Sequence, residues 1–364
     1  MALTTVRPQG MGFNTGRRNL FINGAMQVAQ RGTSTASVTT GNIYAACDRW
    51  SNSGSSYGTF TLLQSTEAPA GFANSFKYDC TTANGSLSAS SHLGLVQKFE
   101  GQNLQMLEKG TSTAKSVTVS FWVKSNKTGD YTLELDDRDN TRSFSKKYTI
   151  DSADTWEFKS LTFAGDTTGT LDNDNANSFH VSWWLANGSD WTSGTFTTGW
   201  EARTTANRAT PNQVNLADST SNEWYITGVQ MELGENASDF EHRSFGEELL
   251  ACQRYYYDAG FGTNGGGAYS TNRDAQYPHI RACITEFPVT MRAAPTVSIQ
   301  SSSANSMDRF GRGQEECFPK AETVRSTHFQ NITKYTSSAQ TTTANWTDDG
   351  NYISRAGYKV DAEL

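Results

Sequence analysis

Residues Asn222–Gly234 read NEWYITGVQMELG, and this stretch decides the fold class of the chain. Apolar side chains recur at every second position, with one break at Thr227–Gly228, in Trp224, Ile226, Val229, Met231 and Leu233. That pattern is typical of a strand with one buried face and one bulge. Gly234 stops the alternation, and a helical pattern begins soon after it. We therefore expect a β domain to close near residue 243.

Segments with the same strand character recur before this stretch. In SVTVSFWVKS, Ser116–Ser125, apolar residues alternate with polar ones, and Trp122 lies on the polar face. The other expected strands are Gly58–Gln64, Ser75–Cys80, Leu93–Phe99, Asp130–Asp136, Ser143–Ile150, Trp156–Phe163 and Asn177–Leu185. Short strands between turn residues, without a long helical period, predict an all-β sandwich or barrel. We expect Thr33–Gly41 to be a loop rich in Ser and Thr.

A short helical pattern follows the β domain. FGEELLACQRYYY, Phe245–Tyr257, has apolar residues at helical spacing and two glutamates in its first turn, where they favour the helix dipole. Strands are then expected at Tyr277–Phe287, Pro295–Gln300, His328–Thr336 and Tyr352–Leu364. The sequence thus predicts an N-terminal arm at 1–18, a β-sandwich at 19–243, a linker helix at 244–257 and a smaller β domain at 258–364. Because this last domain has few large apolar residues, we expect oligomerisation to complete its core.

Charge and composition argue against several classes of partner. The chain has 364 residues and a formal net charge of −7, which gives no broad attraction to phosphate. We therefore expect neither nucleic-acid binding nor attraction to an anionic membrane surface. The sequence has no apolar run of the ~18 residues that a membrane span needs, and its first residues lack the apolar core of a signal peptide. Five cysteines without a CxxC pair are expected to be mostly reduced core thiols.

Aromatic side chains are the main candidates for ligand binding, since the CH faces of sugars stack on Trp and Tyr. Trp183 and Trp184 are adjacent on an expected strand, so one must face the core and the other the opposite side. Our candidate glycan-binding residues are Trp122, Trp191 and Trp200, of which the last two lie in the Ser/Gly/Thr-rich stretch NGSDWTSGTFTTGW. The alternative is that most tryptophans pack in a core or at a subunit interface, where large aromatics are equally common.

Acidic residues form two further candidate sites. LDNDN, Leu171–Asn175, clusters oxygen ligands suited to calcium, yet it lacks the Gly and terminal Glu of an EF-hand loop, so a solvated turn is favoured. In LELDDRD, Glu134 and Asp136 share one strand face and Asp137 follows, as in a glycosidase pair. We favour instead a strand that runs into a charged turn. Because the five histidines form no HxxxH pair and GxSxG is absent, we predict no catalytic residue, no metal site and no cofactor.

Several stretches, in this order, resemble a known family: NLFINGAMQVAQRGTS, SVTVSFWVKS, NEWYITGVQMELG with FEHRSFGEELLACQRYY, and FPVTMRAAPTV with AGYKVDAEL. The family comprises tail-fibre and receptor-binding virion proteins of tailed bacteriophages, with a jelly-roll domain like a carbohydrate-binding module. The resemblance implies a structural virion protein that is made in the cytoplasm of the bacterial host, assembles as a homotrimer and contacts host surface glycans. It also implies that the arm attaches to other virion proteins, through Val6, Arg7, Pro8, Phe13, Arg17 and Arg18.

Two other functions stay open at this point. A purely structural head-decoration or fibre-adaptor protein would bind other virion proteins and no glycan. A polysaccharide depolymerase would need two carboxylates that face one groove. Burial of all three candidate tryptophans would favour the first of these alternatives over glycan binding.

Overall fold

The computed structural model describes residues 18–259, 280–300, 306–309, 313–316, 318–326, 328–334, 352–353 and 357–364. The chain divides into two compact units. The first takes the chain up to Gln27 and then Gly32–Arg243, and the second takes Val28–Arg31 and the chain from Ser244. The short segment Val28–Arg31 thus interrupts the first unit, which the sequence pattern did not indicate. Of the arm residues named above, Val6, Arg7, Pro8, Phe13 and Arg17 lie outside the described residues.

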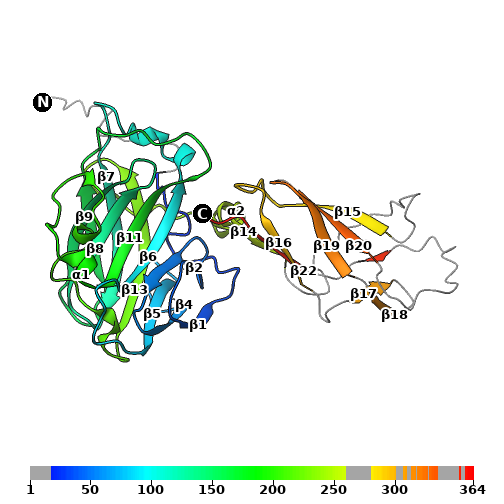
Figure 1. Ribbon diagram of the computed structural model, residues 1–364, viewed down its shortest axis with the longest axis horizontal. Coiled ribbons are helices and arrows are strands. Elements are labelled where there is room, and N and C mark those ends of the chain that lie inside the picture. Colours follow the sequence, from blue (N-terminus) through cyan, green and yellow to red (C-terminus); the bar gives the residue numbers. More distant parts are fainter. Residues whose placement is uncertain are drawn as a thin grey trace, which may run out of the picture. The chain divides into compact units, whose positions relative to one another are not determined.

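The first unit is a jelly-roll β-sandwich of two antiparallel sheets (Figure 1). One sheet has the strand order β1 (Ser34–Val38), β4 (Thr59–Ser65), β5 (Ser75–Thr82), β13 (Glu223–Leu233), β7 (Val117–Ser125) and β10 (Glu157–Phe163). The other has the order β12 (Glu201–Ala202), β9 (Arg142–Ile150), β8 (Gly129–Asp137), β11 (Asn177–Asn187), β6 (His92–Glu100), β3 (Ser51–Ser55) and β2 (Ile43–Tyr44). Helix α1 (Ser189–Thr192) and 3-10 helices at Gly101–Asn103, Gln105–Leu107, Thr205–Asn207 and Leu216–Asp218 lie in the connections. The strands expected between residues 58 and 233 are confirmed to within a residue or two.

Alternate residues of both sheets build one hydrophobic core. Phe121 of β7 and Trp183 of β11 meet across the sandwich, with ring centres 5.6 Å apart and planes at 89°. Trp183 belongs to this core, whereas Trp184 belongs to a separate cluster with Trp191. The expectation that the two adjacent rings point to opposite faces is therefore confirmed.

The stretch NEWYITGVQMELG forms β13, a central strand of the six-stranded sheet. Its expected bulge is confirmed, because the register with β7 shifts between Thr227 and Gln230. Gly228, inside the bulge, has φ +61°, and a Cβ atom there would lie 2.6 Å from Cζ of Phe72. Glycine is required at this position for both reasons.

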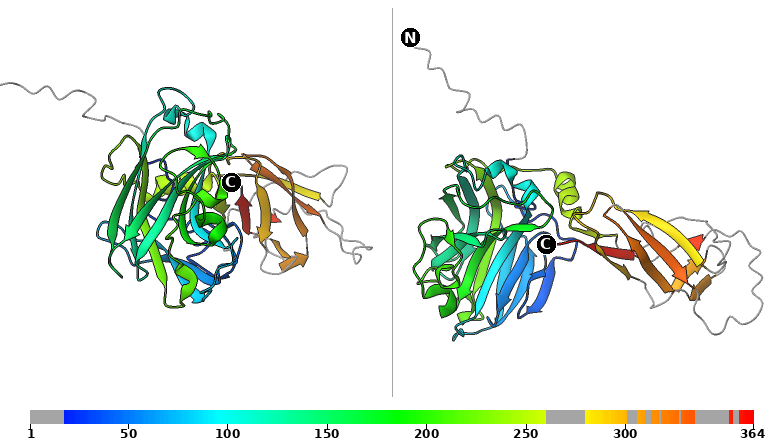
Figure 2. Two further views of the ribbon diagram at one scale, coloured as in Figure 1. Left: turned by 60° about the vertical axis from the view of Figure 1, so that its left-hand side comes forward. Right: turned by 45° about the horizontal axis from the view of Figure 1, so that its top comes forward.

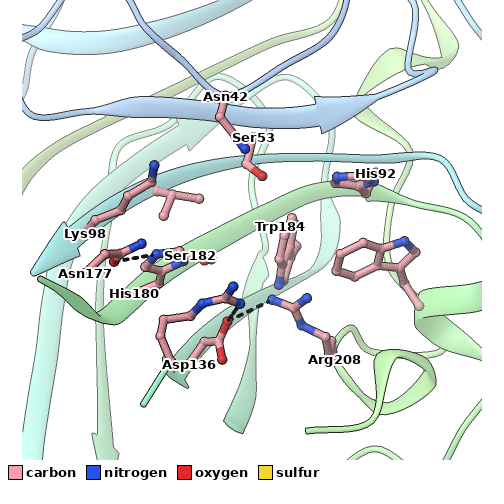
Figure 3. Close-up of a pocket in the computed structure, with 13 residues that line it drawn as sticks. Asn42, Ser53, His92, Lys98, Asp136, Asn177, His180, Ser182, Trp184 and Arg208 are labelled. Atoms are coloured by element: carbon pink, nitrogen blue, oxygen red, sulfur yellow. Dashed lines mark hydrogen bonds and ion pairs between the residues drawn. The ribbon is translucent and has the colours of Figure 1, made fainter. Parts of the chain in front are cut away.

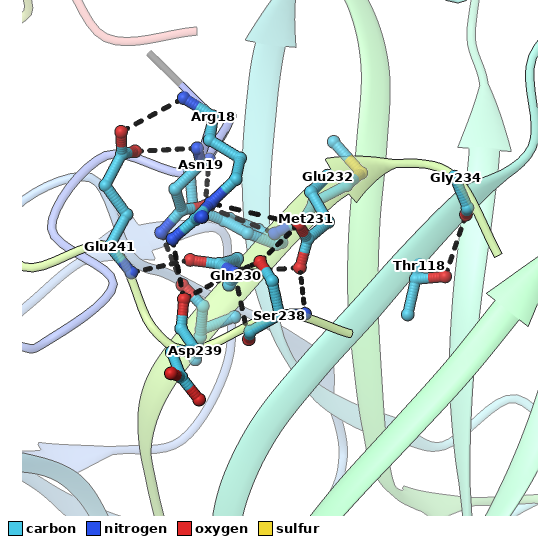
Figure 4. Close-up of polar contacts among 12 residues, drawn as sticks. Arg18, Asn19, Thr118, Gln230, Met231, Glu232, Gly234, Ser238, Asp239 and Glu241 are labelled. Carbon is cyan, nitrogen blue, oxygen red and sulfur yellow. Dashed lines mark hydrogen bonds and ion pairs between the residues drawn. The ribbon is translucent and has the colours of Figure 1, made fainter. Parts of the chain in front are cut away.

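The first described residues are part of the sandwich and lie against the second half of β13 (Figure 4). The backbone N–H of Leu20 donates to the carbonyl of Met231 at 2.9 Å. The backbone N–H groups of Arg18 and Asn19 donate to the carboxylate of Glu241, at 3.1 and 2.7 Å. Arg18 is therefore held at the edge of the first unit and is not part of a separate arm.

One expectation for the first unit is wrong. Residues 33–41 were expected to form a loop, but they contain β1, which pairs with β4 in the antiparallel sense, for example Ser34 with Leu63. Most of β1 is exposed, so it has no apolar alternation to reveal it. Pairing with a neighbouring strand, which is not encoded locally, makes this segment a strand.

The second unit begins with helix α2 (Phe245–Gln253), which is shorter than the sequence pattern predicts. Ser244 caps it: the Ser244 side chain accepts from the N–H of Glu247, and the Glu247 carboxylate accepts from the N–H of Ser244. This reciprocal capping box fixes the start of the helix. The helix ends before the tyrosine run because Tyr256–Asp258 pairs as strand β14, and aromatic residues favour strands.

The described strands of the second unit form three-stranded sheets, drawn mainly in yellow to red in Figure 2. One has the strand order β14, β22 (Gly357–Asp361) and β16 (Thr296–Gln300). A second has the order β15 (Ile280–Glu286), β20 (His328–Lys334) and β19 (Phe318–Val324). A third has the order β18 (Gly313–Glu316), β17 (Ser306–Arg309) and β21 (Tyr352–Ile353). A small core among the described residues comprises Phe287, Met291, Tyr358, Val360 and Ala362. The prediction of a smaller C-terminal β unit after a short helix thus holds for the fold class.

Candidate functional site

A groove of about 320 Å³ lies on the outer face of the seven-stranded sheet. The antiparallel register of β6, β11 and β8 builds its floor, because directly paired residues stand side by side on one face. One such row is Lys98, His180 and Asp136, and the next rows are Val96, Ser182 and Glu134, then Gly94, Trp184 and Thr132. Asn42 and Ser53 line the groove from the side of β2 and β3 (Figure 3).

Aromatic rings form one end of the groove. The rings of Trp184 and Trp191 have centres 4.8 Å apart, and the ring of His92 lies 4.5 Å from that of Trp191. Helix α1 places Trp191 here. Gly94 leaves room for the indole of Trp184, since a Cβ atom at residue 94 would lie 2.7 Å from Cε3 of that ring. The rings are mostly covered, with Trp184 2% and Trp191 9% exposed.

Two carboxylates and three arginines form a charged network at the floor. Figure 3 shows the part of it in which Asp136 meets Arg208. Nε and Nη2 of Arg208 donate to the two oxygens of Glu134, at 2.7 and 2.8 Å. Nη1 of Arg203 donates to both oxygens of Asp136, at 2.8 and 3.0 Å, and Nη1 of Arg138 donates to Asp136 Oδ2 at 3.1 Å. Both carboxylates are fully buried. The network therefore fixes the arginines on the sheet.

Burial shifts the proton affinity of two groups on this floor. Desolvation raises the pKa of Glu134 above its ordinary value, an effect opposed by the Arg208 guanidinium and reinforced by the Asp136 charge. Desolvation also lowers the pKa of His180 to about 3, so this ring is neutral at physiological pH. Its Nε2 lies 2.9 Å from Oδ1 of Asn177, which as an amide oxygen accepts the N–H.

The preferred interpretation of LELDDRD, a strand that runs into a charged turn, is confirmed, since β8 ends at Asp137 and a turn follows. The sequence did not indicate that Glu134 and Asp136 are fully buried. Both carboxylates accept hydrogen bonds from arginine on their two oxygens. We therefore assign them to holding the arginines in place and not to proton transfer. One feature of the sequence could have indicated the arginine network, namely two acidic residues at alternate positions of an otherwise apolar strand. Carboxylates that are buried in this way need cationic partners.

The three candidate tryptophans lie at separate places. Trp191 lines the groove. Trp122 lies on β7 in the other sheet, half-buried, with its ring centre 5.5 Å from that of the exposed Phe158. Trp200 packs against the core and its Nε1 donates to the carbonyl of Ala164 at 2.8 Å. The sequence did not indicate the groove residues Lys98, His180 and Arg208, which come from distant parts of the chain.

A buried ammonium occupies an oxygen-lined site beside Trp200. Nζ of Lys109 contacts the carboxylates of Asp137 and Asp166 and lies 2.9 Å from each of the carbonyl oxygens of Thr168 and Gly169. The lysine side chain is 4% exposed, and the two carboxylates are 0% and 3% exposed. Lys109 thus supplies positive charge to both carboxylates, and Asp166 has a second cationic partner in Arg142, whose Nε and Nη2 donate to it at 2.7 and 3.1 Å.

The structure gives no further support for a metal site within the described residues, where no group of three or more His, Cys, Asp and Glu side chains is placed to hold an ion. Asp172 and Asp174 of LDNDN are both exposed, and Oδ1 of Asp174 accepts from the N–H of Ala176 at 2.8 Å. Among the described helices, none has the length and apolar character that crossing a membrane requires.

No family model matches this chain, and no curated protein does. Solved structures that are similar to it include the enzymatically active domain of bacteriophage CBA120 tailspike protein 4, with 13% identity and a TM-score of 0.31 over 59% of this chain and 21% of that one. A protein from Bacteroides thetaiotaomicron has 12% identity and a TM-score of 0.32, and the match covers 60% of this chain and 100% of that one. The family 11 carbohydrate-binding module from Clostridium thermocellum, in complex with a mixed-linked tetrasaccharide, has 13% identity and a TM-score of 0.28. The match covers 58% of this chain and 98% of that module.

Proposed function

We propose that the first unit binds a glycan in the groove on its seven-stranded sheet, and that the chain is a subunit of a phage appendage, of tail-fibre type, that attaches the particle to its host. The observation that carries glycan binding is the groove itself. It combines an open polar floor with an aromatic end, which is the mixture that a saccharide requires.

Polar groups from four strands and their connections converge on the groove. Asn42 and Ser53 lie on the side of β2 and β3, and Asn177 and Lys98 lie at the end away from Trp184 and His92 (Figure 3). Amide, hydroxyl and ammonium groups can donate to or accept from sugar hydroxyls. Arg208 is held over the rings of Trp191 and Trp184, with Cζ 4.7 and 5.3 Å from the ring centres, so the aromatic end is rigid.

The virion role rests on the sequence resemblance. A homotrimer is supported by the sequence from residue 258 on, which has few large apolar residues, so that a partner chain would complete the core. Three copies of one groove would bind a surface polymer with high effective concentration, so that each groove could be weak. Labelling intact particles with an antibody against this chain, followed by electron microscopy, tests the location. Label at the tip of an appendage supports the proposal, and label on the capsid alone contradicts the attachment role.

A groove-blocking variant tests glycan binding. Ser53→Trp places an indole in the groove, and Thr81→Trp adds the same indole to an exposed position of β5 in the other sheet. With a glycan array and titration calorimetry on the best hit, we expect S53W to lower affinity by about tenfold or more, and T81W to lower it less than about twofold. Equal affinities for wild type and S53W would place binding elsewhere.

The candidate tryptophans are tested in the same assay. Trp191→Ala removes the wall of the groove and should weaken binding, whereas Trp122→Ala should leave it unchanged. Near-ultraviolet circular dichroism checks that each variant keeps its fold. Loss of binding in W122A with retention in W191A would move the glycan site to the other sheet.

A further inference from the structure

We infer that the glycan recognised in this groove is acidic, a saccharide that carries negative charge, and that Lys98 and Arg138 contact that charge. The inference rests on the proposed function, since it names the class of ligand for the same site. The observation behind it is an excess of positive charge in the groove of a chain whose formal net charge is −7.

The charged residues that line the groove are Lys98, Arg138, Arg208 and Asp136, so cations are in excess. Arg203 and Glu134 lie next to the lining residues, paired with Asp136 and Arg208. Because their charges are opposite, including them leaves the excess unchanged. Glu100 follows two positions after Lys98 on β6 but does not line the groove, and its carboxylate accepts from Gln102. Field lines concentrate in such a concave site, which attracts an anion.

The cations have different roles. Arg208 uses Nε and Nη2 on Glu134 and lies against two indole rings, so it is a positioning residue with a side chain only 13% exposed. Arg138 donates one hydrogen bond, from Nη1 to Asp136, and its side chain is 38% exposed, so its remaining N–H donors are available to a ligand. Lys98 lines the groove beside His180, with Nζ 5.5 Å from the ring centre of Tyr44. Lys98 and Arg138 are therefore the cations placed to meet a ligand.

Two further features of the groove agree with a charged ligand. The tryptophan rings at its end are mostly covered, so most of the open lining is polar. His180, between Lys98 and Asp136 on the floor, is neutral at physiological pH, and burial also lowers the pKa of His92 at the aromatic end. The positive charge therefore comes from lysine and arginine, which do not titrate in that range. Salt should therefore weaken binding, while a change of pH between about 6 and 8 should not.

The test compares matched polymers that differ only in charge. The probes are polygalacturonate and polysialic acid, each beside the same polymer with its carboxyl groups reduced to alcohols. An array of acidic and neutral bacterial surface glycans extends the panel. For the full-length wild-type protein we expect binding to acidic glycans, loss of at least about fivefold in affinity on carboxyl reduction, and weakening between about 50 and 500 mM NaCl.

Variants assign the effect to the groove. Lys98→Met and Arg138→Met should each lower affinity for the acidic glycan by about five- to tenfold, and Lys98→Arg should retain most of it. Lys159→Met, on β10 of the other sheet, removes the same charge from the protein and should have little effect. Equal binding of reduced and acidic glycans, or unchanged affinity in K98M and R138M, overturns the inference but leaves glycan binding intact. Binding to neither set overturns the proposed function as well.

Discussion

The guanidinium of Arg208 forms a two-point ion pair with the carboxylate of Glu134, with Nε 2.7 Å from Oε1 and Nη2 2.8 Å from Oε2. The Glu134 side chain is 0% exposed and that of Arg208 is 13% exposed. Arg208 lies in the connection between β12 and β13, and the ion pair fixes it to β8, an interior strand of the seven-stranded sheet. Nε1 of Trp184 donates to the same carboxylate at 2.9 Å, so the pair also orients the aromatic end of the groove.

Arg208→Met should therefore destabilise the first unit strongly. The substitution leaves the buried carboxylate of Glu134 without its cationic partner, which costs about 3–5 kcal/mol in the free energy of unfolding. Urea denaturation measures this. The double variant R208M/E134M should be less destabilised than R208M alone, because it also removes the unpaired charge. A loss below about 1 kcal/mol in R208M would show that the pair is not a structural support.

Lys109→Met tests the buried ammonium in the same way. It leaves the buried carboxylate of Asp137 without its cationic partner, while Asp166 keeps its ion pair with Arg142, and we expect a loss of about 3–5 kcal/mol in the free energy of unfolding. Lys147→Met is the matched control, because Lys147 is 56% exposed in its pair with Asp130 and should contribute less than about 1 kcal/mol. Similar losses in the two variants would contradict the special role of Lys109.

His180 should make the stability of the first unit depend on pH. Burial lowers its pKa from an ordinary value of 6.5 to about 3. Between these values the unfolded chain binds a proton that the folded chain does not, so the free energy of unfolding falls as pH is lowered, by up to about 1.4 kcal/mol per pH unit.

The variant His180→Gln removes this contribution, so its free energy of unfolding should fall less steeply from pH 7 to pH 4 than that of wild type. Urea titrations at each pH measure the two slopes. His242→Gln, at an exposed histidine, is the control and should keep the wild-type slope. If the free energy of unfolding changed with pH in the same way in wild type and H180Q, His180 would not be the source of the pH dependence.

Gly94→Ala tests the close packing of Trp184 on β6. The added Cβ atom would lie 2.7 Å from Cε3 of Trp184 and 2.8 Å from the carbonyl oxygen of Trp183, so the strand or the ring must move. We expect a loss of about 1–3 kcal/mol and a change in near-ultraviolet circular dichroism. Gly85→Ala, where a Cβ atom meets nothing within 4 Å, should change stability by less than about 0.5 kcal/mol. Comparable effects of the two substitutions would contradict this packing argument.

Strand alternation made most of the sandwich predictable. In β7 and β13 apolar side chains of the core alternate with mostly polar side chains on the other face, and this local pattern is present in consecutive residues, including the break at Gly228. The sequence did not predict β1, because its residues are mostly exposed. The end of α2 was predicted too late in the chain, because Tyr256 pairs with β22 as part of strand β14. The arm, the trimer and the glycan-binding tryptophans remain predictions.

The sequence by itself determined the all-β class, the places of the strands in the first unit and the opposite orientations of Trp183 and Trp184, because each depends on a period of two along one segment. Only the tertiary structure decided the groove. Lys98, His180 and Asp136 become neighbours through the register of three strands that are far apart in the chain, and Arg208 reaches them from a connection. Strand pairing is non-local, so side chains that share a floor in space have no common pattern in the sequence.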